Sequence, residues 1–134
     1  MVINGCSGVP YWVKGPYSFE KGGYIYAVGY HPPTFNPEDA RKYAERNAKS
    51  ELAKIAGVRI EEITKDIISK MGVSTSEFLL KETILEVNNE IEGIEPQYCW
   101  IDMEGKVRQK GGAFCLVRIE KSRLFKKVEE KINK

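Results

Sequence analysis

Aromatic and β-branched residues gather in the stretch "YIYAVGY", Tyr24 to Tyr30, and this pattern predicts a β-strand. The turn signal Lys21-Gly22-Gly23 comes just before it, so we expect Phe19 and Glu20 to begin a hairpin partner. The following "HPPTFNP" predicts a loop, because consecutive prolines deny the backbone both helical and ladder hydrogen bonds.

A helix with a small-residue face is expected next. Asn36 is a good N-cap, Pro37 suits the first helical position, and the acids that follow complement the helix dipole. We expect this helix to end near Ala56, with Gly57 as its stop. Its inward stripe, at helical spacing, is Ala40, Ala44, Ala48, Leu52 and Ile55. Since alanine dominates the stripe, the helix should lie flat and close on a sheet.

The middle of the chain fits two patterns. Val58 to Lys70 alternates like a strand at its start, yet its isoleucines also fit a helix; the recurrent β-branched residues favour a long strand. After a break at Met71 to Ser74, a second helix is expected to start at Ser74 or Thr75 and to end at Gly93. Its apolar stripe is Leu80, Ile84, Val87 and Ile91.

The last third predicts a second hairpin and a helix. The segment "IEPQYCWIDMEGK" reads as a strand leading into a turn at Glu104-Gly105, and Gly112 to Glu120 is the returning strand, with a loose or bulged section at 109–112. A final helix with Leu124, Phe125, Val128 and Ile132 on one face is expected to cap the sheet. We therefore predict an α+β fold: a mostly antiparallel sheet, a long alanine-striped helix and a C-terminal helix. Residues 1–18 would be an N-terminal spacer and residues 19–134 a single domain.

Composition narrows the function. The chain has 134 residues, and its formal charge is only +2, from 21 basic and 19 acidic residues. That balance argues against a strong attraction to nucleic acid or to an anionic membrane. No apolar run approaches the ~20 residues of a membrane-spanning helix. The bias toward Glu, Lys and Ile, with few amides, follows the trend of thermophiles.

Candidate chemistry is sparse. His31, the single histidine, precedes two prolines and is expected to be an ordinary surface residue. Glu61 and Glu62 are adjacent, so in a strand they would point to opposite faces. Asp102 and Glu104 flank a turn and are expected to be solvated. The chain has no clustered metal ligands and no phosphate-binding loop, and it predicts neither an enzyme nor a bound cofactor.

Nucleic-acid binding is one alternative that the sequence leaves open. Lys106, Arg108 and Lys110 alternate along an expected strand edge, and tyrosines at positions 24, 26 and 30 share one face of another strand. Aromatic rings and cations on a sheet can stack bases. The near-neutral charge favours the other interpretation, half-buried tyrosines and a solvated basic face.

The three cysteines are too few and too scattered for a zinc site. Cys99 and Cys115 fall almost opposite one another on the two strands expected to pair. A disulfide can form only if their Cα atoms come within ~7 Å. The favoured interpretation is two small buried thiols, and the alternative is a cross-strand disulfide, which would indicate an oxidising compartment.

Several short motifs follow one another in an order that suggests a family. They are "CSGVPYWV" from Cys6, "YAVGY" ending at Tyr30, "KSELA" from Lys49 to Ala53, "WIDMEG" from Trp100 to Gly105 and "CLVR" from Cys115 to Arg118. In this order they resemble the LPP-twenty family of bacterial lipoproteins. The resemblance implies an envelope lipoprotein, on the outer membrane, whose first mature cysteine is acylated in the precursor. That cysteine would be Cys6, and Ile3-Asn4-Gly5 would be the tail of its lipobox.

The resemblance implies no catalytic position, so we expect a non-enzymatic envelope domain that acts by contacting an unknown protein partner. Membrane contact would come only through the lipid at Cys6, and the precursor would carry an apolar signal segment upstream. The first rival hypothesis is a small cytosolic scaffold protein that forms oligomers through its sheet edges. The second is an enzyme or a nucleic-acid-binding domain.

Overall fold

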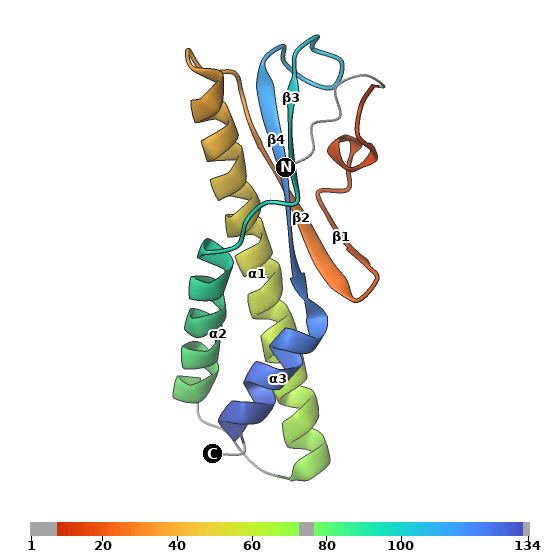
Figure 1. Cartoon of the computed structure of the whole chain (residues 1–134). Helices are drawn as coiled ribbons and strands as arrows, with labels where there is room; N and C mark the ends of the chain where they lie inside the picture. Colours follow the sequence, from red (N-terminus) through yellow and green to blue (C-terminus); the bar gives the residue numbers. More distant parts are fainter. Residues whose placement is uncertain (1–7, 73–76, 133–134) are drawn as a thin grey trace.

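The computed structural model describes residues 8–72 and 77–132. A four-stranded antiparallel sheet lies on one long helix, and two shorter helices pack beside that helix (Figure 1). The strands are β1 (Ser18–Lys21), β2 (Tyr24–His31), β3 (Tyr98–Asp102) and β4 (Gly112–Glu120), in the order β1-β2-β4-β3. The helices are α1 (Pro37–Met71), α2 (Glu77–Glu92) and α3 (Lys121–Ile132), with a 3₁₀ turn, η1 (Tyr11–Lys14), before β1. The predicted α+β fold, both hairpins and the C-terminal helix are confirmed.

The sheet presents two different faces because side chains alternate along each strand. On β2, Ile25, Ala27 and Gly29 point toward α1, and the tyrosines point to the outer face. β4 pairs with β2 from Tyr24 opposite Glu120 to His31 opposite Ala113. β4 is buried along nearly its whole length, which makes it the structural centre of the domain.

The first half of α1 lies almost directly on the sheet. Asn36 caps it as expected, accepting a hydrogen bond from the backbone N–H of Glu38 at 3.0 Å. Ala40, Ala44 and Ala48 are completely buried. A β-carbon on Gly29 would lie 2.8 Å from the Cα of Ala48, so only glycine fits beneath the helix there. The predicted close packing of an alanine stripe on the sheet is therefore confirmed.

The prediction of a stop at Gly57 and a strand over residues 58–70 is wrong, because α1 continues as a helix to Met71. Gly57 lies inside the helix, where its α-hydrogens face the Ile84 side chain of α2. A β-carbon at this position would lie 3.9 Å from that side chain, an ordinary contact, so the glycine neither ends the helix nor is required for its packing on α2. The helix ends at Gly72, which adopts the left-handed conformation and donates its N–H to the carbonyl of Ile68.

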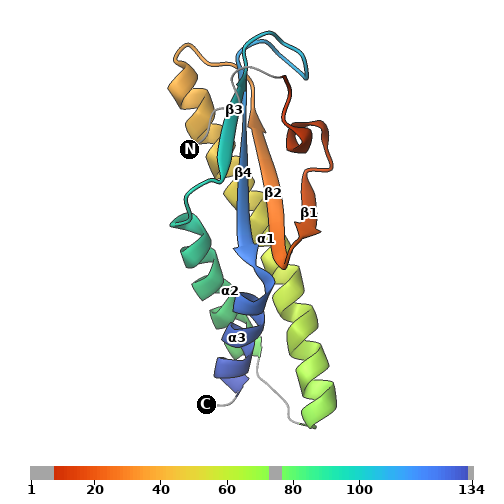
Figure 2. The ribbon, with the colours of Figure 1, turned by 45° about the vertical axis from the view of Figure 1, so that its right-hand side comes forward.

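The second half of α1 extends beyond the sheet and forms a helical bundle with α2 and α3 (Figure 2). Its buried residues Ile60, Thr64 and Ile67 continue the helical stripe. The predicted start of α2, at Ser74 or Thr75, lies outside the described residues. Val87 and Ile91 of its expected apolar stripe are buried.

α3 buries Leu124 and Val128 mainly against α1 and α2, so the prediction that it caps the sheet is corrected. Phe125 is 44% exposed, so it does not lie on the inner face of α3 as the sequence predicted.

The segment between residues 8 and 18 packs on the outer face of the sheet instead of extending away from it. Trp12 and Val13 are buried, and they join Val28, Phe114 and Leu116 in a second hydrophobic cluster. This part of the predicted spacer therefore contributes to the core.

Candidate functional site

The outer face of the sheet is the surface that α1 leaves uncovered. η1 covers the part of it around Val28 and Phe114. The remainder, which we call the open sheet face, is defined by Phe19, Tyr24, Tyr26, Tyr98 and Arg118. Four of these side chains are half-buried, and Tyr98 is 41% exposed. The predicted sharing of one face by the β2 tyrosines is confirmed, and so is their half-buried packing.

Arg118 lies at the centre of the open sheet face. β4 places it directly opposite Tyr26 of β2. Its guanidinium carbon is 3.9 Å from the ring centroid of Tyr24, and one terminal nitrogen (Nη1) donates to the Tyr26 hydroxyl at 3.2 Å. Cation–π and hydrogen-bond contacts thus fix the arginine without a carboxylate.

Arg118 stays positively charged, and no ion pair with a carboxylate neutralises it among the described residues. The hydrogen bond to Tyr26 raises the pKa of the guanidinium, so it remains protonated at every accessible pH. Among residues 8–72 and 77–132, no carboxylate forms an ion pair with it, and Tyr26 is its hydrogen-bond partner. Within those residues one of its five N–H donors has a protein acceptor, and Glu120 attracts the guanidinium without forming an ion pair with it.

Neighbouring rings extend the open sheet face. Phe19 and Tyr26 stack with their centroids 4.8 Å apart, and Tyr11 lies 6.4 Å from Phe19. Next to Arg118, on the side away from β1, is a hollow of about 300 Å³. Its lining is Tyr24, Glu90, Ile94, Gln97, Arg118, Ile119, Glu120 and Arg123. The arginine therefore stands between an aromatic platform and a small depression that both charged and apolar side chains line.

Asp102 is fully buried, which corrects the expectation of a solvated turn acid. Its carboxylate accepts three backbone hydrogen bonds from the β3–β4 connection, at 2.7, 2.9 and 3.1 Å, from Lys106, Val107 and Arg108. Burial raises the pKa of this carboxyl, but these bonds and one from Gly105 together hold the pKa below its usual range. Asp102 organises the loop that joins the last two strands. Glu104, in contrast, is exposed, as predicted.

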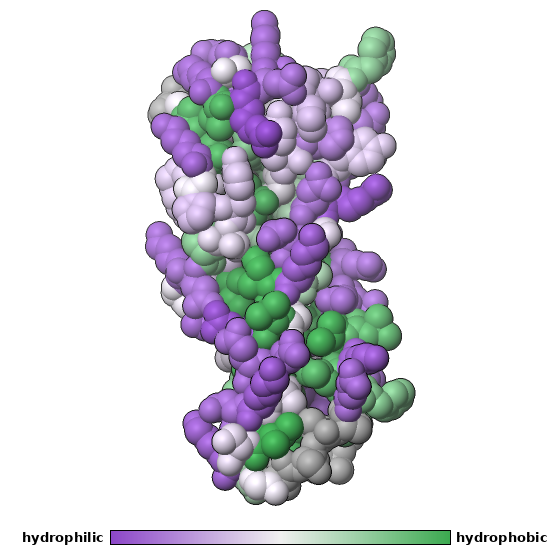
Figure 3. All heavy atoms as spheres, turned by 180° about the vertical axis from the view of Figure 1, so that it is seen from behind, coloured by the Kyte–Doolittle hydropathy of each residue, from purple (hydrophilic) through white to green (hydrophobic). Residues whose placement is uncertain are grey.

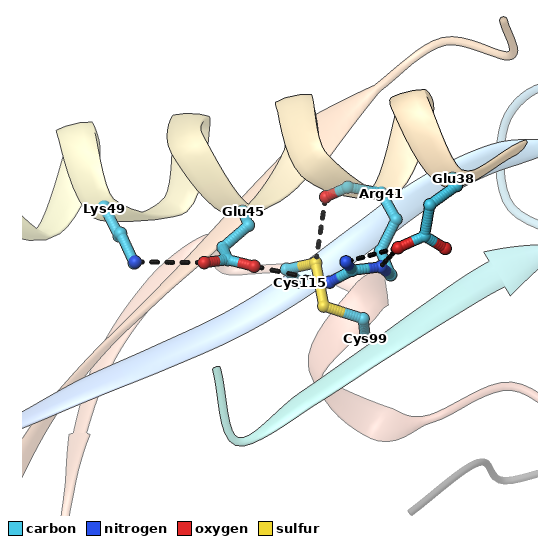
Figure 4. The surroundings of a disulfide bond; sticks show 6 residues. All are labelled: Glu38, Arg41, Glu45, Lys49, Cys99 and Cys115. Atoms are coloured by element: carbon cyan, nitrogen blue, oxygen red, sulfur yellow. Dashed lines mark hydrogen bonds and ion pairs between the residues drawn. A yellow bond between two sulfur atoms is a disulfide. The ribbon is translucent and has the colours of Figure 1, made fainter. Parts of the chain in front are cut away.

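A disulfide joins Cys99 of β3 to Cys115 of β4. The sequence pattern favoured two buried thiols, and that interpretation is wrong; its alternative, the cross-strand disulfide, is present. The two residues are directly paired, with their Cα atoms 4.1 Å apart. The bridge lies between the sheet and α1, where the carbonyl of Arg41 is 3.5 Å from the Cys115 sulfur (Figure 4). Glu38, Arg41, Glu45 and Lys49 form a chain of ion pairs along the neighbouring side of α1.

The other candidate residues do not form one site. His31 is half-buried at the end of β2, where its ring is 4.8 Å from that of Tyr43 on α1. Lys106, Arg108 and Lys110 lie in the β3–β4 loop and not on a strand edge, which corrects that expectation. Arg108 stands over the Tyr30 ring at 4.0 Å. Glu61 and Glu62 lie on α1 instead of a strand, and Cys6 lies outside the described residues.

Two further observations limit the chemistry of the described part of the chain. It contains no group of three or more His, Cys, Asp or Glu side chains arranged to hold a metal ion. None of its helices combines the length and the apolar character needed to cross a bilayer. The rear surface is largely hydrophilic, with separate apolar patches (Figure 3). The large apolar side chains exposed on α1 and α2 include Val58, Phe78 and Leu85.

Comparison with known proteins gives no match to any family model, to any curated protein or to any solved structure. The resemblance to the LPP-twenty family therefore rests on the sequence motifs alone.

One residue of the open sheet face could have been found from the sequence. Arg118 is a cation between Val117 and Ile119 in an otherwise apolar strand, and such a residue needs a partner on the neighbouring strand.

Proposed function

We propose that this chain is a non-enzymatic domain of the bacterial cell envelope that binds a protein partner through the open sheet face. The observation that carries the proposal is Arg118, a charged guanidinium held between aromatic rings, with one of its five N–H donors bonded within the described residues. Tyrosine and arginine are the side chains that contribute most often to the energetic centres of protein interfaces.

The geometry of Arg118 suits it for binding. Its contacts with Tyr24 and Tyr26 hold the side chain before a partner arrives, so less rotamer entropy is lost on association. The planar guanidinium can donate two parallel hydrogen bonds to a carboxylate. We therefore expect the partner to place an Asp or Glu side chain on this face.

The disulfide supports the envelope location, because such bonds persist in oxidising compartments. Acylation of Cys6 follows from the family resemblance and belongs to the precursor. The two supports are independent of each other, since one rests on β3 and β4 and the other on residues upstream of the described domain.

The open sheet face supports nucleic-acid binding less well. A base needs an exposed aromatic ring to stack on. Arg118 occupies one face of Tyr24, and Phe19 stacks on Tyr26, so these ring faces are already used. A steep salt dependence of oligonucleotide binding would nevertheless favour this alternative over ours.

Site-specific photo-cross-linking in the native cells tests the interface. A photoreactive amino acid replaces Tyr24, and in a matched control it replaces Tyr43, which is 40% exposed on α1. We expect a protein adduct at position 24 that is absent at position 43. Arg118→Ala should abolish the adduct. Arg118→Lys keeps the positive charge but loses the two parallel N–H donors of the guanidinium, so it should only reduce the adduct. Absence of an adduct at position 24, or equal adducts at both positions, would contradict the proposal.

The envelope location has its own test. Rapid alkylation of free thiols in intact cells should leave Cys99 and Cys115 unmodified, and the protein should fractionate with the envelope. Reading the gene upstream of Met1 should show a basic and apolar signal segment ahead of Cys6. Reduced cysteines together with a cytosolic fraction would favour the scaffold hypothesis instead.

A further inference from the structure

β3 is an edge strand whose free side is suited to pairing. Among residues 8–72 and 77–132, its one neighbour in the sheet is β4, which leaves the other side of the strand unpaired by any described strand. Edge strands are normally protected by Lys, Pro, a bulge or short length. β1, at the opposite edge, has four residues and carries Glu20 and Lys21. β3 is only one residue longer, with five residues, but its sequence "YCWID" contains no Lys, Pro or Gly.

The free edge of β3 is also held in a fixed position. The Cys99–Cys115 disulfide ties the strand covalently to β4. At its far end, Asp102 binds three backbone N–H groups of the following loop. An edge strand that does not fray loses little entropy when another strand is added.

The two ends of β3 carry opposite charges. Glu92, the last residue of α2, and Glu95, in the connection that leads into β3, are exposed, and among the described residues neither side chain has an ion-pair partner. At the other end, the β3–β4 loop exposes Lys106, Arg108 and Lys110 together with one acid, Glu104, whose carboxylate lies 3.4 Å from the Lys106 ammonium, so the loop keeps an excess of positive charge. The loop and the α2–β3 connection lie at opposite ends of the strand (Figure 1). We call the first group the acidic corner and the second the basic loop.

We propose that two copies of this chain associate by antiparallel pairing of their β3 edges, forming a two-fold symmetric dimer with one continuous sheet. Trp100 is the middle residue of β3, so the largest overlap places it opposite its symmetry mate. The basic loop of each copy then meets the acidic corner of the other. Parallel pairing would instead bring like charges together, so the charge pattern selects the antiparallel arrangement.

This dimer does not rest on the proposed function. It pairs the edge of β3, which carries Tyr98 at the border of the open sheet face, and leaves Tyr24 and Arg118 of both copies on the same outer surface. The assembly would therefore display two open sheet faces.

Sedimentation equilibrium of the full chain tests the proposal. We expect the average mass to rise from monomer to dimer with concentration and the association to weaken with salt. Glu92→Lys/Glu95→Lys should weaken dimerisation about tenfold, and so should Lys106→Glu/Lys110→Glu. Combining all four substitutions restores opposite charges and should restore the dimer. The control Glu62→Lys/Glu130→Lys makes the same charge change on α1 and α3 and should have no effect.

Cross-linking then locates the contact. In a Cys6→Ser background, Trp100→Cys should form a covalent dimer under mild oxidation, because a residue on the two-fold axis faces itself at ~5 Å between β-carbons. Tyr24→Cys, on the same face but on β2, should not. A monomer at all concentrations, a dimer insensitive to the charge reversals, or equal cross-linking at both positions would overturn the proposal.

Discussion

Gly29 of β2 and Ala48 of α1 approach so closely that a β-carbon on the glycine would lie 2.8 Å from the Cα of the alanine, and closer still to the carbonyl oxygen of Ala44. Both neighbouring atoms belong to the helix backbone, which cannot rotate away as a side chain can. The first half of α1 therefore depends on this one missing side chain for its position on the sheet.

Gly29→Ala should lower the free energy of unfolding by about 3 kcal/mol, since the helix must move away from the sheet to admit a methyl group. Urea denaturation followed by circular dichroism measures the change. A loss below about 1 kcal/mol would mean that α1 can shift at little cost.

Gly57→Ala should have the opposite effect. The added β-carbon would lie 3.9 Å from the Ile84 side chain, an ordinary contact, and alanine is favoured inside a helix. We expect the free energy of unfolding to rise by about 0.5–1 kcal/mol in the same denaturation experiment. A loss of stability would indicate a turn at this position and would contradict a continuous α1.

Reduction of the Cys99–Cys115 disulfide should lower stability by about 3 kcal/mol, because the bridge closes a loop across a sequence separation of 16 residues. Urea midpoints with and without a reducing agent measure it, and the double variant Cys99→Ala/Cys115→Ala should not respond to the reducing agent. Cys6→Ser should respond just as the wild type does, which separates the bridge from general thiol effects.

Asp102→Asn should cost about 2 kcal/mol at neutral pH, because one carboxylate oxygen that accepts backbone N–H groups is replaced by a donor. The pH dependence has a definite sign. The folded pKa lies below the usual value of 3.8, so the stabilisation is present above that value and is lost as the pH falls from about 4 through the folded pKa.

The measurement is the difference in stability between wild type and Asp102→Asn from pH 7 to pH 2. The subtraction matters because the hydrogen bond from Arg123 also lowers the pKa of Glu90. The difference should shrink as the pH falls below about 4. A difference that stays constant over this range would show that the Asp102 charge does not stabilise the loop.

Local patterns were enough to predict the hairpins and the start of α1. The alternation in "YIYAVGY" and the Asn36-Pro37 cap each act within a few residues. The run from Val58 to Lys70 could not be assigned in this way, because β-branched residues fit both a strand and a buried helix. The deciding contacts are made in the bundle with α2 and α3, outside the segment itself.

The candidate site shows the same limit. Tyr24 and Arg118 meet only because β2 and β4 pair in one particular register, and that register depends on the whole core. Asp102 looked like a solvated acid since its partners are backbone N–H groups, which carry no sequence signature. Cys99 and Cys115 were placed opposite each other by counting through the loop, yet the choice between thiols and a bridge needed their geometry.

The unbroken course of α1 has a mechanical consequence. At a rise of 1.5 Å per residue, its 35 residues span about 50 Å and connect the sheet to the helical bundle without a joint. Tilting either end therefore tilts the other by the same angle. We therefore expect a pull on one end of α1 to be transmitted along a single continuous helix to its other end.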